Sequence, residues 1–312
     1  MDALLVLMVI AWALNYSILK RVFQEFPPMV FNTLRMVLSS AVFYGLIRAA
    51  RWRARLAAPE RSTTFYTPNT LTTRDRIDLI WLGIVGHGLY QLCFGNGLAM
   101  TAASSAALII GCTPVIVALI SVAIGRERLG PLHWLGATLS TVGIYFVVRR
   151  GGSSSGGEET VAGDLLVMVA AVCWAAYTVG GTRVMSRHSP LYVTGITMIC
   201  GTVPYALASL PQFFRVDWRA ISITAWLLVI PAGLLALCFA HLVWYAAVKQ
   251  LGPARTSMYA NAIPLTAMLI AVLWLGESIS GGTMIGTAAI IGGVLLTRLA
   301  PKRGPATEPA QA

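Results

Sequence analysis

Charged residues are scarce in this sequence, and acidic residues are the scarcest of them. Only 11% of the 312 residues are charged, and 12 Asp and Glu stand against 23 Lys and Arg. Soluble domains carry roughly 25% charged residues. With 57% of its residues hydrophobic, the chain has too little polar surface to cover a soluble fold. The composition therefore indicates an integral membrane protein.

Three further absences narrow the function. The five cysteines lie singly in apolar segments without metal-ligand spacing, so we expect neither a metal site nor a disulfide framework. The sequence has no phosphate loop with a Gly-Lys-Ser/Thr ending, which argues against ATP coupling. The basic residues are spread over short loops, so no nucleic-acid partner is expected, and nothing in the sequence implies a cofactor.

Ten apolar segments, each near the length that crosses a bilayer, predict ten transmembrane α-helices. The predicted spans are 3–20, 29–48, 77–99, 103–124, 131–149, 163–183, 190–210, 222–248, 254–274 and 281–299. Sixteen of the 23 Lys and Arg residues fall on one side of these spans, six fall on the other, and Arg35 lies within a span. The positive-inside rule then predicts a multi-pass protein of the inner (plasma) membrane with both termini in the cytoplasm.

The two halves of the sequence repeat one another. The matched positions are Trp12, Arg21 and Pro28 with Trp174, Arg183 and Pro190 (offset 162), Gly88 with Gly233 (offset 145), and Pro114, Glu127, Gly136 and Gly143 with Pro264, Glu277, Gly286 and Gly293 (offset 150). Because each half holds five spans, the second half enters the membrane with opposite polarity. The predicted fold is an all-α integral membrane protein with ten transmembrane helices in two inverted five-helix repeats.

The repeats divide the chain into four parts. Residues 1–150 form the first repeat, which includes a basic cytoplasmic loop at 49–76. A Gly/Ser linker is expected at 151–162, and the second repeat occupies 163–300. Residues 301–312 are predicted to be a disordered tail.

The order of the repeated residues along the ten predicted spans resembles the EamA-type branch of the drug/metabolite transporter superfamily. The residues that carry the resemblance are Trp12 and Trp174 in the first helix of each repeat, Arg35 in the second helix, Pro114 and Pro264 in the fourth, and Glu127 and Glu277 after it. The resemblance implies an inner-membrane carrier of small organic solutes, often an exporter of amino acids. The second repeat has Thr197 where the first has Arg35, so no symmetric role is expected at that position.

Polar and aromatic residues form stripes at helical spacing on four of the predicted spans. The candidate cavity residues are Trp12, Asn15, Tyr16, His87, Tyr90, Gln91, Trp174, Tyr177, His241 and Trp244. Because the repeat relates these four helices in pairs, we predict that the stripes face one central cavity for a small-molecule substrate. The alternative is that they serve helix packing or interfacial belts.

Arg35 and two prolines are further candidates. A guanidinium well inside a span must face protein or water. Arg35 could therefore bind a substrate carboxylate or phosphate, or it could clamp backbone carbonyl groups. Pro114 and Pro264 are expected to kink their helices, either as hinges for gating or as static bends that aid packing.

The acidic residues bear on energy coupling. Every Asp and Glu falls in a loop or at the end of a predicted span, so we expect no buried carboxylate. Glu127 and Glu277 are expected to stabilise the N-terminus of the helix that follows each of them. This pattern favours facilitated transport, with proton coupling through His87 or His241 as the alternative.

The sequence thus predicts a transporter, most simply an exporter of small organic metabolites such as amino acids, that works by alternating access around a central cavity. The alternatives are a proton-coupled antiporter of drugs or nucleoside-type solutes, a channel, and a membrane-embedded enzyme. The scattered single carboxylates argue against the enzyme. The oligomeric state, monomer or homodimer, is left open.

Overall fold

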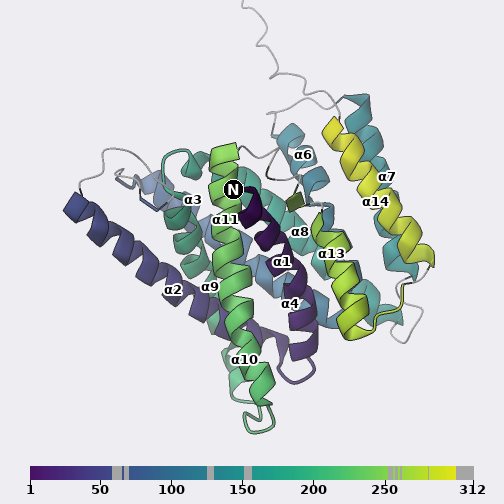
Figure 1. Cartoon of the computed structure of the whole chain (residues 1–312), viewed down its shortest axis with the longest axis horizontal. Coiled ribbons are helices and arrows are strands. Elements are labelled where there is room, and N and C mark those ends of the chain that lie inside the picture. The colour runs from purple at the N-terminus through teal and green to yellow at the C-terminus, as the bar shows by residue number, and fades with distance from the viewer. Residues whose placement is uncertain are drawn as a thin grey trace, which may run out of the picture.

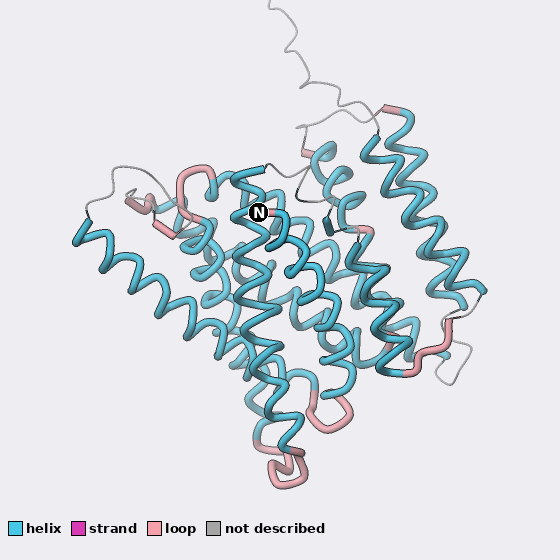
Figure 2. The backbone as a smooth tube through the Cα atoms, viewed as in Figure 1, coloured by secondary structure: helices cyan, strands magenta, loops and turns pink. Residues whose placement is uncertain are grey.

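Helices arranged side by side make up the fold (Figure 1). The computed structural model describes residues 1–57, 65–66, 70–124, 130–150, 157–251, 256, 259–260, 262–279 and 281–299. Every regular element in these ranges is a helix (Figure 2). The elements are α1 (Asp2–Val22), α2 (Pro28–Ala57), α3 (Thr73–Gly83), η1 (Ile84–Leu89), α4 (Tyr90–Met100), α5 (Ala103–Gly111), α6 (Thr113–Ala123), α7 (Pro131–Arg150), α8 (Gly157–Met185), α9 (Pro190–Phe213), α10 (Ile223–Pro231), η2 (Ala232–Phe239), α11 (Ala240–Leu251), α13 (Ala262–Ile270), η3 (Ala271–Leu275) and α14 (Gly281–Leu299).

Six of the described helical stretches are long and apolar enough to cross a membrane. They are Asp2–Val22, Pro28–Leu56, Thr73–Met100, Thr160–Met185, Pro190–Phe213 and Ile223–Gln250. Four shorter apolar stretches accompany them: Ala103–Val117, Trp134–Phe146, Ala262–Leu275 and Gly281–Leu296. The all-helical membrane architecture agrees with the sequence, and the count of ten spans stays a prediction.

The bundle places polar residues inside and apolar residues outside. Leu7, Leu207 and Leu273 are 52%, 63% and 77% exposed, whereas Arg35 and His87 are fully buried. Water would penalise such an apolar surface, but hydrocarbon does not, and the buried polar side chains bond to one another. This distribution fits a protein solvated by lipid.

The end of α1 lies beside the start of α8. Lys20 Nζ, near the end of α1, donates to the carbonyl oxygens of Leu98, Ala99 and Thr101 at 3.2, 3.1 and 2.6 Å. Thr101 Oγ1 in turn donates to Asp164 Oδ1, near the start of α8, at 2.6 Å. As a result, α1 and α8 run through the bundle in opposite directions.

Three predicted segments differ in detail from the structure. The span expected at 103–124 is broken at Cys112, which separates α5 from α6. The span expected at 222–248 is a continuous succession of α10, η2 and α11. Helix α8 begins at Gly157, inside the expected linker 151–162. Glu127, the tail at 301–312, residues 151–156 of the linker and parts of the loop 49–76 lie outside the described residues.

Two loop carboxylates cap helices that are distant in the sequence. Glu277 accepts hydrogen bonds from the backbone N–H groups of Ala103 (2.8 Å) and Ser104 (3.2 Å) and from the Ser104 hydroxyl (2.6 Å). It therefore caps α5, and the expectation that it serves the following helix α14 is wrong. Glu25 accepts from the Ser222 N–H at 2.9 Å, and hydrogen bonding from Ser222 holds the pKa of the Glu25 carboxyl below its usual range.

Helices α7 and α14 pack through glycines that bring their backbones into contact. A Cβ on Gly143 would lie 2.8 Å from the carbonyl oxygen of Gly286. A Cβ on Gly293 would collide with the carbonyl oxygen of Gly136 and with Ser140 Oγ. We call the contact between Gly136, Gly143, Gly286 and Gly293 the glycine seam. Small residues allow this close approach of membrane helices.

The glycine seam gives a stability prediction. We expect Gly293→Ala to destabilise the protein by about 1–3 kcal/mol, because its methyl group has no space. The adjacent Gly292→Ala is the matched control, since its Cβ would meet only Leu139 Cδ2 at 3.5 Å, an ordinary contact. Thermal unfolding of the purified variants in detergent measures the difference. Equal melting temperatures for the two variants would contradict the packing described above.

Candidate functional site

The polar and aromatic stripes of four segments meet in one place. We call Trp12, His87, Tyr90, Trp174, Tyr177, His241 and Trp244 the aromatic cluster. At its centre, the Trp12 ring lies 6.1 Å from the ring of Trp174, 5.4 Å from His241 and 5.7 Å from Trp244, measured between centroids. The cluster therefore joins α1, α8 and α11.

The remaining members connect the cluster to η1 and α4. The His87 ring lies 5.0 Å from Tyr177 and 5.6 Å from His241, and its Nε2 is 3.3 Å from the Tyr177 hydroxyl. The Tyr90 ring lies 5.5 Å from Trp174 and stacks on Phe94, whose ring contacts Tyr16 at 5.4 Å. All eight aromatic and histidine residues predicted to line the cavity are thus linked by ring contacts.

Two π-helical turns shape the walls of the cluster. His87 lies in η1, and η2 precedes His241. The carbonyl oxygen of Ala236, in η2, accepts from Trp12 Nε1 at 3.0 Å and lies 2.9 Å from His241 Nδ1. Such turns within α-helices occur frequently at functional sites. Here one of them supplies a backbone acceptor to two rings of the cluster.

Arg35 lies at the centre of a second group of buried residues. Its Nη1 donates to Asn15 Oδ1 at 3.0 Å, its Nη2 to Gln91 Oε1 at 2.7 Å and its Nε to Asn32 Oδ1 at 2.7 Å. We call these four residues the arginine network. Its acceptors are side-chain amides rather than the backbone carbonyls expected as one alternative. Among the described residues no carboxylate contacts the guanidinium.

Asn32 is the member of the arginine network that sequence reasoning missed. It precedes Arg35 by three residues on α2, and this spacing places both side chains on one face of the helix. Asn32 is fully buried, and its amide also donates to the carbonyl oxygen of Gln91 at 3.4 Å. The three-residue spacing between Asn32 and Arg35 was therefore the sequence signal that could have identified Asn32 as part of the network.

The aromatic cluster contains buried polar atoms that have no hydrogen-bond partner among the described residues. They are His87 Nδ1, His241 Nε2 and Trp244 Nε1. Buried polar atoms in proteins are almost always bonded, so each exception requires an explanation. Together they give the cluster one indole donor and two imidazole nitrogens for a polar ligand.

Both prolines lie within helical segments. Pro114 is the second residue of α6, directly after the break at Cys112, and Pro264 lies in α13, with residues 259 and 260 before it also helical. A Cβ on Gly111, at the end of α5, would lie 2.6 Å from Pro264 Cγ, so the proline ring packs closely on α5. Whether either proline acts as a hinge stays a prediction.

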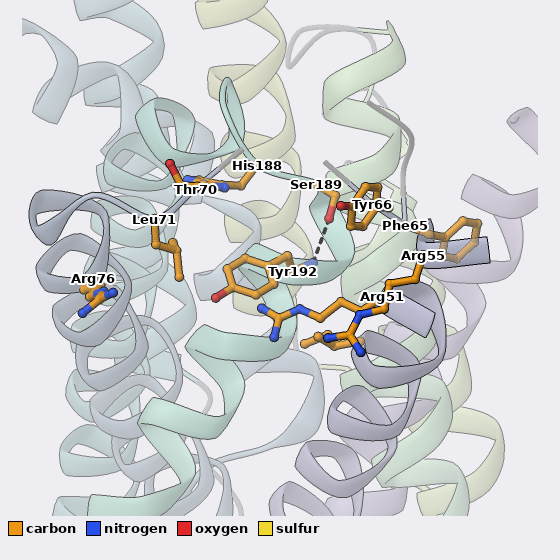
Figure 3. A pocket seen from close by; sticks show the side chains of 11 residues that line it. Arg51, Arg55, Phe65, Tyr66, Thr70, Leu71, Arg76, His188, Ser189 and Tyr192 are labelled. Atoms are coloured by element: carbon orange, nitrogen blue, oxygen red, sulfur yellow. Dashed lines mark hydrogen bonds between the residues drawn. The ribbon is translucent and has the colours of Figure 1, made fainter. Parts of the chain in front are cut away.

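A cavity of about 530 Å³ lies elsewhere, at the end of the bundle that holds the N-terminus. We call it the Arg51 cavity. Arg51, Arg55, Arg76, His188, Ser189 and Tyr192 are among the residues that line it (Figure 3). None of the candidate cavity residues named from the sequence lines it. The rings of the aromatic cluster contact one another, and Trp12, Tyr90 and Trp174 are partly exposed.

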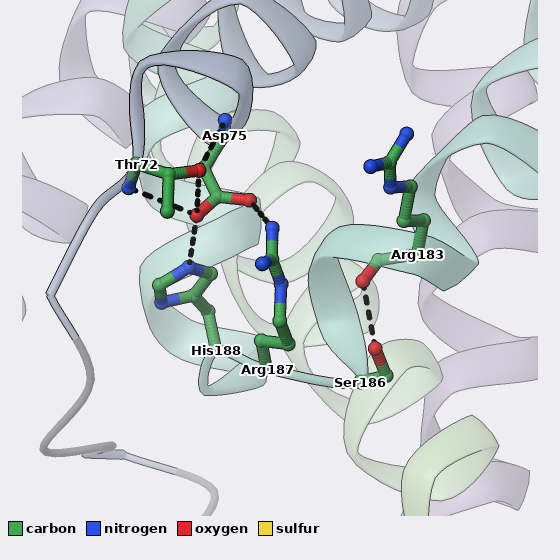
Figure 4. Close-up of polar contacts among 6 residues, drawn as sticks. All are labelled: Thr72, Asp75, Arg183, Ser186, Arg187 and His188. Atoms are coloured by element: carbon green, nitrogen blue, oxygen red, sulfur yellow. Dashed lines mark hydrogen bonds and ion pairs between the residues drawn. The ribbon is translucent and has the colours of Figure 1, made fainter.

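Two carboxylates are buried, so the expectation that none would be is wrong. Asp75 and Asp164 are each 1% exposed. Asp75 accepts from Thr72 in a capping box of α3 and pairs with Arg187 and His188 (Figure 4). Asp164 accepts only from Thr101, and its Oδ2 has no partner among the described residues. Asp75 lies in the first turn of α3, whereas Asp164 is the eighth residue of α8, and neighbouring helix ends cover both.

Comparisons with known proteins agree with a transporter. The model of the EamA-like transporter family matches residues 1–149 and 161–299. The uncharacterized transporter YyaM of Bacillus subtilis (strain 168) is 27% identical over 90% of this chain and 93% of its own. The probable terminal-alkyne amino-acid exporter of Streptantibioticus cattleyicolor is 25% identical over 72% of this chain and 73% of its own. A crystal structure with 21% identity, covering 94% of both chains, has a TM-score of 0.62, which indicates the same fold.

The arginine network predicts a large effect of a conservative substitution. We expect Arg35→Lys to lower the free energy of unfolding by about 1–3 kcal/mol, because an ammonium group cannot reproduce the planar fork and leaves a buried amide oxygen unpaired. Arg48→Lys is the control, since Arg48 lies on the same helix and is exposed. Thermal unfolding of the purified variants tests this, and no difference between them would refute a structural role for the network.

Proposed function

Because the chain belongs to the EamA-like transporter family, we propose that it exports a small organic solute of the amino-acid type by alternating access around the aromatic cluster. The solute binds among the rings of the cluster when the bundle opens. The observation that carries this proposal is the set of buried, unpartnered polar atoms on His87, His241 and Trp244 within an aromatic wall. Small-molecule sites combine apolar walls with a few polar groups that fix orientation.

The arginine network supports a zwitterionic solute. A carboxylate would form charge-assisted hydrogen bonds with Arg35 in place of neutral amide acceptors. The rings of Trp12, Trp174 and Tyr90 offer faces that attract an ammonium group. Asn15 lies one turn from Trp12, and Gln91 follows Tyr90 directly, so the network borders the cluster on two helices. The name of the exporter from Streptantibioticus cattleyicolor points to the same substrate class and direction.

Contacts between repeat-related residues support two inverted halves. Residues on a two-fold axis contact their own counterparts. Trp12 and Trp174, which are 162 positions apart, have ring centroids 6.1 Å apart. Ser40 and Thr202, also 162 positions apart, share a hydrogen bond of 2.9 Å between their hydroxyl groups.

The glycine seam follows the same rule. Gly136 corresponds to Gly286 and Gly143 to Gly293, and the contacts join Gly136 to Gly293 and Gly143 to Gly286. This is the reciprocal pattern that a two-fold axis produces. In such proteins one repeat rocks against the other around a site at their interface. We therefore place the solute on the pseudo-symmetry axis, between the two tryptophans.

Asp164 favours a second candidate function, a proton-coupled antiporter of drugs or nucleoside-type solutes. Its carboxylate is 1% exposed and has one oxygen without a partner among the described residues. Ionisable groups within a membrane often mark proton pathways. Transport driven by a pH gradient and abolished in Asp164→Asn would favour this candidate over facilitated export.

The transport assay begins with identification of the solute. Thermal-shift screening of the purified protein against amino acids, nucleosides and cationic drugs suits this purpose, because a ligand at about 100 times its dissociation constant adds about 2.7 kcal/mol of stability. Counterflow of the identified solute in proteoliposomes then distinguishes a carrier from a channel, since only a carrier saturates and exchanges.

We expect Trp12→Ala and Trp174→Ala each to reduce the initial counterflow rate at least tenfold, because both remove a ring from the centre of the cluster. Trp134→Ala is the control: this tryptophan is 53% exposed on α7 and shares no ring contact with the cluster in the part of the chain that the structure describes. Rates are compared at equal amounts of folded protein in the vesicles. Unchanged counterflow in both cluster variants would refute the proposed site.

A further inference from the structure

The Arg51 cavity, which is partly open to solvent, concentrates positive charge. Arg51 and Arg55 come from the last turns of α2, and Arg76 comes from the first turns of α3 (Figure 3). Arg51 and Arg55 are four residues apart, so they project from the same face of α2. No acidic residue is among the described residues that line the cavity.

The nearest buried carboxylate cannot neutralise these three guanidinium groups. Asp75 lies one position before Arg76, but its two oxygens accept from Thr72, Arg187 and His188 (Figure 4). Its hydrogen bonds are thus directed to the cap of its own helix α3 and to the turn between α8 and α9. The lining of the cavity keeps a net positive charge.

One of the three arginines contacts an aromatic ring that also lines the cavity. The Arg51 guanidinium carbon lies 5.3 Å from the centroid of the Tyr192 ring, a cation–π contact. This contact keeps the Arg51 cation at the wall of the cavity, and a guanidinium has five N–H donors with which to bind an acceptor. Ser189 caps α9 by accepting from the Tyr192 N–H at 3.3 Å, so the positive end of a 24-residue helix also borders the cavity.

A basic loop at a membrane surface is commonly only a topology signal, and its side chains are solvated. Such a loop does not require a cavity of about 530 Å³ lined by an aromatic ring that contacts one of the guanidinium groups. This volume lies in the range that holds small metabolites. Guanidinium groups on two helices, with a helix N-terminus beside them, match the geometry of carboxylate and phosphate oxygens.

We propose that the Arg51 cavity binds an oxyanion, a carboxylate or phosphate group carried by a small solute or by a lipid headgroup. Arg51 and Arg55 hold it from α2, and Arg76 holds it from α3. The cavity is separate from the aromatic cluster and shares none of its residues. An anion bound there would link the ends of α2 and α3 to the start of α9.

The test uses the purified full-length chain in phosphatidylcholine nanodiscs. Inorganic phosphate is titrated against chloride at matched ionic strength, and the melting temperature is recorded. We expect a saturable rise with phosphate in the unmodified protein. In the Arg51→Gln/Arg55→Gln double variant the apparent dissociation constant should rise at least tenfold. Arg53→Gln is the matched control, because Arg53 is exposed on the same helix and does not line the cavity.

A second variant keeps the test informative if the double variant misfolds. Arg76→Gln removes a guanidinium from α3 rather than α2, and it too should weaken phosphate binding. Each variant is compared with its own phosphate-free sample. The proposal is overturned if the unmodified protein shows no saturable response, or if Arg53→Gln weakens binding as much as the cavity variants do.

A lipid arm distinguishes the two sources of the oxyanion. If phosphatidylglycerol in the nanodiscs raises the apparent dissociation constant of phosphate in the unmodified protein, then a headgroup occupies the cavity. An unchanged constant assigns the cavity to a soluble anion. Trp12→Ala should keep the full phosphate response, so failure of the proposed export function and failure of this binding site are observed separately.

Discussion

A guanidinium that is fully buried inside a membrane bundle must be satisfied by the protein around it. Insertion of such a charge costs about 2.5–3.5 kcal/mol even in a single helix. Here three amide oxygens from α1, α2 and α4 accept from Arg35. These helices cannot separate without leaving the charge exposed to hydrocarbon. The network therefore fixes the relative position of Trp12 on α1 and Tyr90 on α4, and with them one wall of the aromatic cluster.

Local periodicity explains what could be predicted from the sequence. The i, i+3, i+4 spacing of Trp12, Asn15 and Tyr16 placed them on one face, and ring contacts bring the stripes together, while their role as a substrate cavity stays a prediction. The contacts of Glu277 with α5 could not be foreseen, because its partners are 173 and 174 residues away. Burial of Asp164 likewise depends on the end of α4, which no pattern within α8 encodes.

The two proposed repeats keep the same geometry with different chemistry. Asn15 and Arg35 bond to each other in the first half. Their counterparts at an offset of 162, Tyr177 and Thr197, also bond to each other, through hydroxyl groups 2.9 Å apart. One half therefore presents a cation at this position and the other a neutral pair. A solute bound between them, as proposed, would meet an asymmetric environment and take a preferred orientation along the bundle.

The glycine seam has a mechanical consequence. Backbones in contact cannot slide along each other by even one residue, because the neighbouring side chains of Ser140 and Ile290 would then meet main-chain atoms. They can still roll, since glycine leaves no side chain to obstruct rotation. In the proposed transporter, helices α7 and α14, one from each proposed repeat, would thereby form a fulcrum at the edge of the molecule, about which the remaining helices could swing.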